Sequence, residues 1–252
     1  NKLYDAWNDE HLRRFWRFWN EPKLYAAMYG CGSSNATNAL PYPTKFFRIL
    51  SSNGPVHLPK LLSNVLKKTN AIVVSRIPKK NYQDICNYCK KNNFKISTGQ
   101  NCTTIMVYNK RWKKTKGKIG IITAGTSDIG IAEESRLMCE AMNCSCITSY
   151  DVGIAGLHRI FPVLKDFVKS GVDAIIVVAG MEGALASVVS STVNVPIIGV
   201  PTSIGYGYGE KGVAALAAML QSCSLGLTVV NIDNGIGAGA AAAKIVSQIN
   251  KW

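Results

Sequence analysis

The sequence predicts an α/β protein. A three-layer α/β/α domain with a parallel sheet of about five strands is expected over residues 117–252, after a small, basic, mixed α/β domain. Five short apolar runs after residue 117 each end at a loop that contains glycine and a polar side chain, and a helical pattern follows each loop. The runs are almost continuously apolar, which indicates strands buried on both faces, as in a parallel sheet covered by helices.

Charge divides the chain at the same place. The 252 residues carry 29 Lys and Arg against 15 Asp and Glu, a net charge of +14, and the 47% hydrophobic content excludes an intrinsically disordered chain. Residues 1–116 hold 21 basic and 5 acidic residues, a net charge of +16, whereas residues 117–252 hold 8 and 10, a net charge of −2. We therefore predict an N-terminal extension at 1–40, a basic accessory domain at 41–116 and a catalytic domain at 117–252, with a solvated linker in Asn109–Gly117.

So strong a positive charge first suggests a nucleic-acid-binding protein. The positive charge is restricted to the first 116 residues and could instead attract a small anionic substrate. Nucleic acid is therefore the last of the expected partners. No secretory signal is visible at the start and no run reaches the roughly 20 apolar residues that cross a bilayer, so no membrane partner is expected. The eight cysteines suggest no disulfide framework, which indicates reduced thiols in an intracellular, cytoplasmic protein.

The basic domain is predicted to alternate helices and strands. Pro41, Pro43 and Gly54 are expected to break up any regular element at its start. The patterns then predict, in order, the helix Pro55–Asn70, the strand Ala71–Ser75, the helix Tyr82–Lys91 and the strand Thr103–Tyr108. Cys86 and Cys89 share one helix face, and no second pair completes a zinc site.

In the predicted catalytic domain, strands and helices alternate five times. The strands are expected at Ile119–Thr123, Cys144–Tyr150, Asp173–Val178, Val195–Val200 and Gly226–Ile232. The helices are expected at Ile129–Met142, at Leu157–Lys169, after Gly183 as far as Thr192, at Val213–Ser222 and at Ala238–Ile249. Short connections of this kind imply right-handed crossovers between parallel strands.

Polar side chains gather directly after these strands. They are Asp128, Asp151, Glu182, Ser203 and Asp233. Because the carboxyl ends of parallel strands meet at one edge, and ligands of open α/β sheets bind there, the sequence predicts a binding or catalytic site at this edge.

Single motifs at this edge allow two interpretations each. The segment Thr126–Asp128 either caps the helix that follows or holds a phosphate or ribose at the helix N-terminus, and it matches neither a P-loop nor a dinucleotide fingerprint. Glu182 is either stabilised by a helix dipole or acts as a general acid or base. His158 and Arg159 open a helix, where they cap it or pair with a carboxylate or phosphate.

Two further motifs are equally open. Gly235, Gly237 and Gly239 either belong to the site or let the last helix pack closely. Cys223 follows a helix, and the C-terminus of a helix does not lower the pKa of a thiol. On periodicity alone, Cys223 would be interpreted as a small buried residue.

Together, the loop sequences resemble one family. The segments are "TAGTSD", "YDVGIAGLHR", "VVAGMEGALASVV", "VPTSIGYG", "MLQSC" and "VVNIDNGIGAG". They resemble the pyridinium-3,5-biscarboxylic acid mononucleotide synthase family, LarB, which is related to the PurE-type aminoimidazole ribonucleotide carboxylases and mutases. The resemblance covers residues 117–252 and extends weakly over 41–108.

The resemblance implies a PurE-like catalytic domain and a carboxylation. The family adds carbon dioxide to the pyridine ring of nicotinic acid adenine dinucleotide and hydrolyses the phosphoanhydride, which releases AMP and a product used for a nickel-pincer cofactor. By resemblance, Cys223 is the nucleophile that adds to the ring and Glu182 is the base that removes the ring proton.

The remaining site positions follow from the same resemblance. Substrate and phosphate binding are expected at Thr126, Ser127, Asp128, Asp151, His158, Arg159, Gly180, Met181, Thr202, Ser203, Gly205, Tyr206, Gly207, Asp233 and Asn234. A magnesium ion on the phosphates is plausible although no ligand set is readable, no organic cofactor is expected, and related families imply a homo-oligomer, an octamer in the PurE case.

Two alternatives stay open. The PurE branch moves a proton with histidine, whereas this chain has Glu182 in the corresponding segment; yet the loop Gly205–Gly212 departs from the pattern expected of the synthase. An aminoimidazole ribonucleotide carboxylase or mutase is therefore the second hypothesis. A non-catalytic module that binds nucleotides or nucleic acid is the third.

Overall fold

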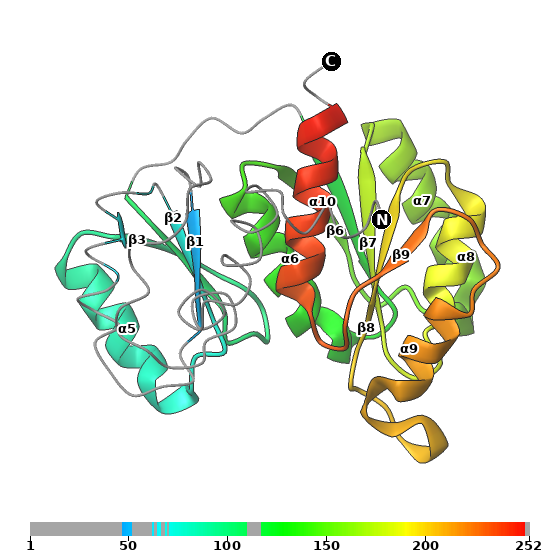
Figure 1. The fold of residues 1–252 in the computed structure, drawn as a ribbon, viewed down its shortest axis with the longest axis horizontal. Helices are drawn as coiled ribbons and strands as arrows, with labels where there is room; N and C mark the ends of the chain where they lie inside the picture. Colours follow the sequence, from blue (N-terminus) through cyan, green and yellow to red (C-terminus); the bar gives the residue numbers. More distant parts are fainter. Residues whose placement is uncertain are drawn as a thin grey trace, which may run out of the picture.

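The computed structural model describes residues 47–51, 62, 65, 66, 69, 71–109 and 117–249. In this part of the chain, helices and two sheets are stacked in layers (Figure 1). The predicted N-terminal extension, the linker after Asn109 and most of the helix expected at Pro55–Asn70 lie outside the described residues.

The C-terminal sheet has five parallel strands in the order β6-β5-β7-β8-β9. The strands are β5 (Lys118–Thr123), β6 (Ser145–Ser149), β7 (Ala174–Ala179), β8 (Ile197–Pro201) and β9 (Leu227–Val229). The helices are α6 (Ile129–Ala141), α7 (Leu157–Ser170), α8 (Ala184–Thr192), α9 (Val213–Leu220) and α10 (Gly235–Ile249). The predicted fold class, a parallel five-stranded sheet between helices, is confirmed.

Alternating side chains of the central strands form two cores. Ile176 and Val178 face α6 and α10, whereas Ile175 and Val177 face α7, α8 and α9. All residues of β7 and β8 are buried, while the edge strands β6 and β9 are partly exposed. Near-continuous apolar sequence therefore marks the centre of the sheet, where helices cover both faces.

The last strand and helix differ from their predicted bounds. Strand β9 is shorter than predicted, and α10 begins at Gly235 rather than at Ala238. A Cβ at Gly235 would lie 2.3 Å from the carbonyl oxygen of Ile131, and one at Gly239 would lie 2.6 Å from that of Ser135. These two glycines therefore let α10 pack closely on α6, the structural interpretation that the sequence allowed.

The N-terminal sheet has four strands in the order β1-β2-β4-β3. They are β1 (Phe47–Ser51), β2 (Ala71–Ser75), β3 (Lys95–Thr98) and β4 (Ile105–Tyr108), with helix α5 (Lys79–Lys91). β1 is parallel to β2, and β2 and β3 are antiparallel to β4. The prediction that no regular element precedes Gly54 is wrong, because pairing with β2 supplies β1 with a neighbour that its own sequence does not reveal. The sequence also missed β3, half of whose residues are exposed.

The two sheets share helix α6. Residues Ala71 and Val73 of β2 and Met106 of β4 pack against Leu137 and Met138 of α6. Helix α6 thus lies between the sheets, and its apolar residues face both of them (Figure 1). No helix among the described residues is long and apolar enough to cross a membrane, and no disulfide joins the described cysteines.

Candidate functional site

Asp128 holds three loops together at the carboxyl edge of the parallel sheet. Its side chain is 3% exposed. Oδ1 accepts a hydrogen bond from Thr202 Oγ1 at 2.7 Å, and Oδ2 accepts one from the backbone N–H of Gly125 at 2.9 Å. The backbone N–H of Gly180 also donates to this carboxylate. The loops after β5, β7 and β8 therefore meet at one buried carboxyl group.

Burial raises the pKa of the Asp128 carboxyl, although the three donors act in the opposite direction. The folded state thus disfavours the ionised form, and keeping a carboxylate here costs stability. Groups retained at such a cost are typical of functional sites.

The loops after β8 and β9 are joined in the same way. Asp233 Oδ1 accepts from the backbone N–H of Ser203 at 2.8 Å, and the backbone N–H of Asp233 donates to the Pro201 carbonyl at 2.9 Å. The N–H of Met181 donates to the Ile204 carbonyl at 3.1 Å, which joins the loop after β7 to the loop after β8. The edge is therefore a set of mutually fixed loops.

Three non-glycine residues at this edge have left-handed backbone conformations. The φ angles are 58° at Asp151, 52° at Met181 and 56° at Asp233. Each follows a different strand of the sheet, and such conformations cost roughly 1 kcal/mol or more for a residue with a Cβ. Other left-handed residues of the described chain, such as Asn93 and Asn143, lie in turns elsewhere, so these three conformations agree with a functional edge but do not identify one by themselves.

The loop after β6 forms the other end of the edge. The guanidinium of Arg159 donates to the carbonyl of Asp151 at 2.7 Å and lies 3.5 Å from its carboxylate. Arg159 therefore has a carboxylate partner within the chain, and His158 beside it is exposed. Both residues lie in the first turn of α7.

The other predicted binding residues fall into two groups. Thr126 and Ser127 are exposed in a short 3₁₀ turn before α6, and Gly205, Tyr206 and Gly207 are exposed beside the turn that leads into α9. Asn234 instead accepts from the backbone N–H of Gly237 at 2.9 Å, so it caps α10.

The two predicted catalytic residues lie in loops next to α8 and α9, two helices that cover the same face of the sheet. Glu182 is exposed in the turn between β7 and α8, next to the fixed loops. Cys223 is exposed after α9 and before β9. Helix α9 leads away from the carboxyl edge, and the carbonyl of Gly226 accepts from the N–H of Ile197, the first residue of β8 (Figure 1). Ser187, the fourth residue of α8, donates to Ser222 Oγ at 2.8 Å, and its carbonyl accepts from Ser224 Oγ at 3.2 Å. The segment that carries Cys223 therefore lies beside α8, the helix that begins after Glu182.

The family follows from a comparison with known proteins. The family model described as AIR carboxylase matches residues 118–251, just over half of the chain and all of the parallel sheet. The chain belongs to the AIR carboxylase family. Outside the match lies the N-terminal sheet, which packs on helix α6 of this AIR carboxylase domain.

Curated relatives of the AIR carboxylase domain include one strong match. An uncharacterized protein of Methanocaldococcus jannaschii is 51% identical over 160 residues, 63% of this chain and 61% of that protein. A probable N5-carboxyaminoimidazole ribonucleotide mutase of Methanothermobacter thermautotrophicus is 29% identical over 52% of this chain and 38% of that protein. The chain thus spans less than two thirds of the length of either relative. A crystal structure of Treponema denticola PurE matches with a TM-score of 0.41 and 18% identity, over 54% of this chain and 92% of that chain.

Among the described residues of the AIR carboxylase domain, no three His, Cys, Asp or Glu side chains are placed to hold a metal ion together. Asp128 accepts hydrogen bonds within the chain, and Asp233 accepts one from the N–H of Ser203. Mg2+ is usually held by one or two carboxylates together with phosphate oxygens, so the magnesium expectation remains a prediction.

The sequence did not indicate the residues that hold the loop after β6 in place at the carboxyl edge of the sheet. Thr123, the last residue of β5, is buried, and its Oγ1 accepts from the N–H of Asp151 at 3.0 Å. The half-buried Tyr150 donates a hydrogen bond to the buried Glu133 directly before the loop after β6. A polar residue at the end of a buried strand was a usable signal for Thr123. The pairing of Glu133 with Tyr150 depends on the tertiary fold and left no local signal.

Proposed function

We propose that this protein carboxylates the pyridine ring of nicotinic acid adenine dinucleotide and hydrolyses its phosphoanhydride to release AMP. The observation that supports this proposal best is the exposed carboxylate of Glu182 beside the fixed loops. His158, the one histidine in the described part of the chain, lies instead on α7. A carboxylate at this position suits removal of a proton from a carbon that has just gained a carboxylate group.

The proposed chemistry needs a nucleophile as well as a base. A pyridinium ring is electron-poor and does not attack carbon dioxide. Addition of the Cys223 thiolate to a ring carbon forms a C–S bond and leaves a dihydropyridine, whose enamine carbon then bonds to carbon dioxide. Glu182 takes the proton from that carbon, the C–S electron pair returns to sulfur, and the aromatic ring is restored. A separate water attack on the phosphoanhydride releases AMP.

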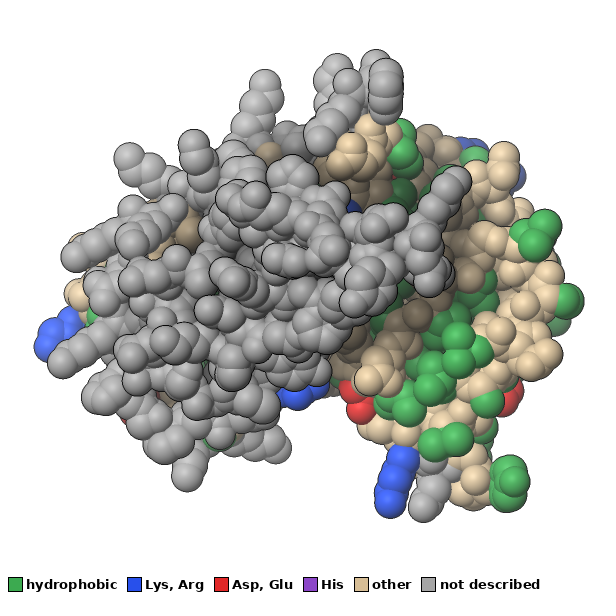
Figure 2. Space-filling view, viewed as in Figure 1, with side chains coloured by type: hydrophobic (Ala, Val, Ile, Leu, Met, Phe, Trp, Pro, Cys, Tyr) green, Lys and Arg blue, Asp and Glu red, His purple; other side chains and the backbone are tan. Residues whose placement is uncertain are grey.

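The exposure of Cys223 makes this proposal one about an assembly. The thiol is exposed beside an apolar surface, so the active form would be a homo-oligomer in which Cys223 of one copy serves the site of a neighbouring copy. Leu220 and Leu225, close to Cys223 in the sequence, are 67% and 92% exposed, and Val213 at the start of α9 is 62% exposed. Figure 2 shows apolar side chains gathered over the α9 face. A second copy that covers this face would bury those side chains and bring a thiol to the site.

One incubation tests the reaction. The protein is supplied with nicotinic acid adenine dinucleotide, bicarbonate and magnesium, and mass spectrometry follows AMP and a mononucleotide with one added carboxylate. Cys223→Ala should abolish carboxylation, while Cys86→Ala, a half-buried thiol of α5, should not. Activity regained on mixing Cys223→Ala with Glu182→Gln subunits would support the shared site. Full carboxylation by Cys223→Ala would overturn the covalent step.

The second candidate is an aminoimidazole ribonucleotide carboxylase or mutase. Three relatives that match about half of this chain at 26–30% identity carry the name N5-carboxyaminoimidazole ribonucleotide mutase, from Thermotoga maritima, Pyrococcus horikoshii and Methanocaldococcus jannaschii. The same assay with the aminoimidazole ribonucleotides separates the two. Turnover of those compounds without turnover of the dinucleotide would favour the mutase reaction and reject the first proposal.

A further inference from the structure

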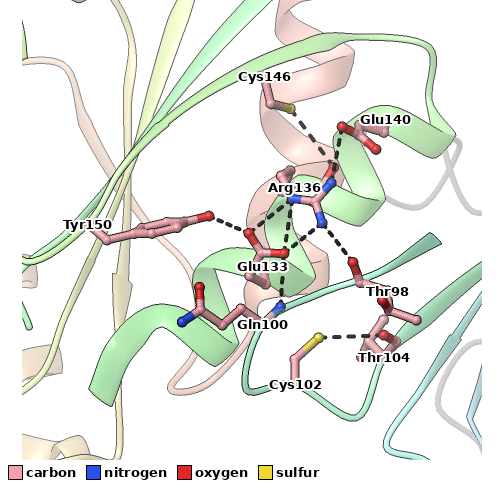
Figure 3. Close-up of polar contacts among 9 residues, drawn as sticks. All are labelled: Thr98, Gln100, Cys102, Thr104, Glu133, Arg136, Glu140, Cys146 and Tyr150. Atoms are coloured by element: carbon pink, nitrogen blue, oxygen red, sulfur yellow. Dashed lines mark hydrogen bonds and ion pairs between the residues drawn. The ribbon is translucent and has the colours of Figure 1, made fainter. Parts of the chain in front are cut away.

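Glu133 lies where the two sheets meet. It is on α6, and only 6% of it is exposed (Figure 3). Its carboxylate accepts from the guanidinium of Arg136, with a closest approach of 2.6 Å, from the phenol of Tyr150, and from the backbone N–H of Gln100 at 3.2 Å. The three donors come from α6 itself, from the end of β6 and from the N-terminal sheet. One carboxylate therefore joins the accessory unit to the AIR carboxylase domain.

On the accessory side, the β3–β4 loop rests directly on α6. A Cβ at Gly130 would lie 2.4 Å from the carbonyl oxygen of Asn101, so the helix and loop are in close backbone contact. Thr104 Oγ1 donates to Glu134 at 2.7 Å, and Arg136 donates to the Thr98 carbonyl at 3.0 Å. The loop is thus held along the first two turns of α6, the helix that begins directly after Asp128.

On the other side, Glu133 reaches the ligand edge through Tyr150. Tyr150 directly precedes Asp151, whose left-handed backbone begins the loop after β6. That loop is held by the Thr123 hydroxyl at the N–H of Asp151 and by Arg159 at its carbonyl. The phenol of Tyr150 adds a third anchor just before the strained residue.

The ionisation states support these hydrogen bonds at neutral pH. Burial alone would raise the pKa of the Glu133 carboxyl, but the hydrogen bonds from Arg136 and Tyr150 and the Arg136 charge outweigh burial, and the pKa of Glu133 is lowered. Burial and the bond to Glu133 raise the pKa of Tyr150 to about 12. The pair is therefore a carboxylate and a neutral phenol, and the charge-assisted bond is retained.

We propose that the β3–β4 loop of the N-terminal unit positions the ligand loop after β6 through the bridge Gln100–Glu133–Tyr150. Glu133 and Tyr150 are positioning residues that touch no substrate, and the accessory unit contributes to dinucleotide binding from behind the site. The identity of this ligand rests on the proposed function, but the positioning does not.

The bridge is separable from the packing that joins the two units. Apolar contacts between β2, β4 and α6 already bury a core at this junction. Removing the Tyr150 hydroxyl leaves that core intact, so Tyr150→Phe is expected to fold. Loss of the hydrogen bond from Tyr150 to the Glu133 carboxylate should then make local opening of residues 150–156 more frequent.

Hydrogen exchange of the full chain tests the positioning without any need for activity. Tyr150→Phe should speed amide exchange in residues 150–156 by roughly tenfold or more. Gly130→Ala places a Cβ against the carbonyl of Asn101 and displaces the β3–β4 loop from α6. This variant should speed amide exchange in residues 99–104 and also in residues 150–156. Tyr88→Phe, on α5 next to Phe94, is the matched control and should change neither segment.

Calorimetric titration with nicotinic acid adenine dinucleotide tests the consequence for binding. Tyr150→Phe should weaken dinucleotide binding about tenfold or more, while Tyr88→Phe binds like the wild type. Wild-type exchange in 150–156 for Tyr150→Phe, or a Gly130→Ala effect confined to 99–104, would overturn the positioning. Faster exchange in both variants, in a protein whose wild type does not bind the dinucleotide, would instead reject the proposed function and leave the positioning in place.

Discussion

Replacement of Thr202 by valine removes one donor from the buried carboxylate that holds three loops. The two side chains are nearly isosteric, so the change deletes the 2.7 Å bond to Asp128 Oδ1 and little else. A hydrogen bond to a charged group contributes about 1.5–3 kcal/mol, and we expect the free energy of unfolding to fall by this amount at neutral pH. For a chain of this size, 2 kcal/mol corresponds to a decrease in Tm of roughly 4–8 °C.

The pH dependence of this loss identifies its origin. The Thr202 hydroxyl lowers the pKa of Asp128, against the effect of burial. Without it, the folded-state pKa of Asp128 rises further, and the folded state disfavours the ionised form more strongly. The destabilisation should therefore be larger at about pH 7.5, where the carboxylate is ionised, than at about pH 4.

Urea unfolding of Thr202→Val and of Thr69→Val measures this difference. Thr69 is also buried, and its Oγ1 donates to the neutral carbonyl of Val65 at 3.0 Å, so the control deletes an uncharged bond. Its cost should be about 1 kcal/mol and independent of pH. Equal losses in the free energy of unfolding for the two variants at both pH values would refute a hydrogen bond from Thr202 to an ionised Asp128.

Glu182→Gln should lower the rate of dinucleotide carboxylation by roughly a hundredfold or more with little change in Tm, because the exposed side chain supports chemistry rather than packing; a wild-type rate would remove Glu182 from the mechanism. Glu133 has a lowered pKa, so its stabilisation is present above about pH 4.5 and is lost as pH falls through the folded-state pKa. Glu133→Gln should therefore be less stable than wild type at neutral pH, and the gap should close in acid in urea titrations; a constant gap would contradict the ionic role. Leu225→Glu should reduce the oligomer mass measured by light scattering, whereas Asn194→Glu at another exposed position should not.

Local sequence patterns were sufficient for the fold of the AIR carboxylase domain. Apolar runs of strand length, helical periodicity and short loops predicted the five strands of the parallel sheet and the five helices that cover it. This was possible because a strand buried on both faces has an almost continuously apolar sequence of its own. The same patterns placed Asp128 and Asp233 at one edge, since parallel strands end together. In the N-terminal unit, β1 and β3 were missed because pairing with β2 and β4, and not their own composition, makes them strands.

The partners of these residues were decided by the tertiary structure alone. The sequence predicted Cys223 and Glu182 in one site, but it did not show that Ser222 and Ser224, on either side of Cys223, are hydrogen-bonded to Ser187 of α8. It carried no sign that Glu133 would face Tyr150 and the backbone of Gln100. The reason is physical: periodicity records which side of an element is apolar, over a few residues, whereas the choice of partner depends on how distant elements are brought together. The sequence by itself determined the layers and the polar carboxyl edge of the sheet, and the packing of α6 between two sheets decided what supports that edge.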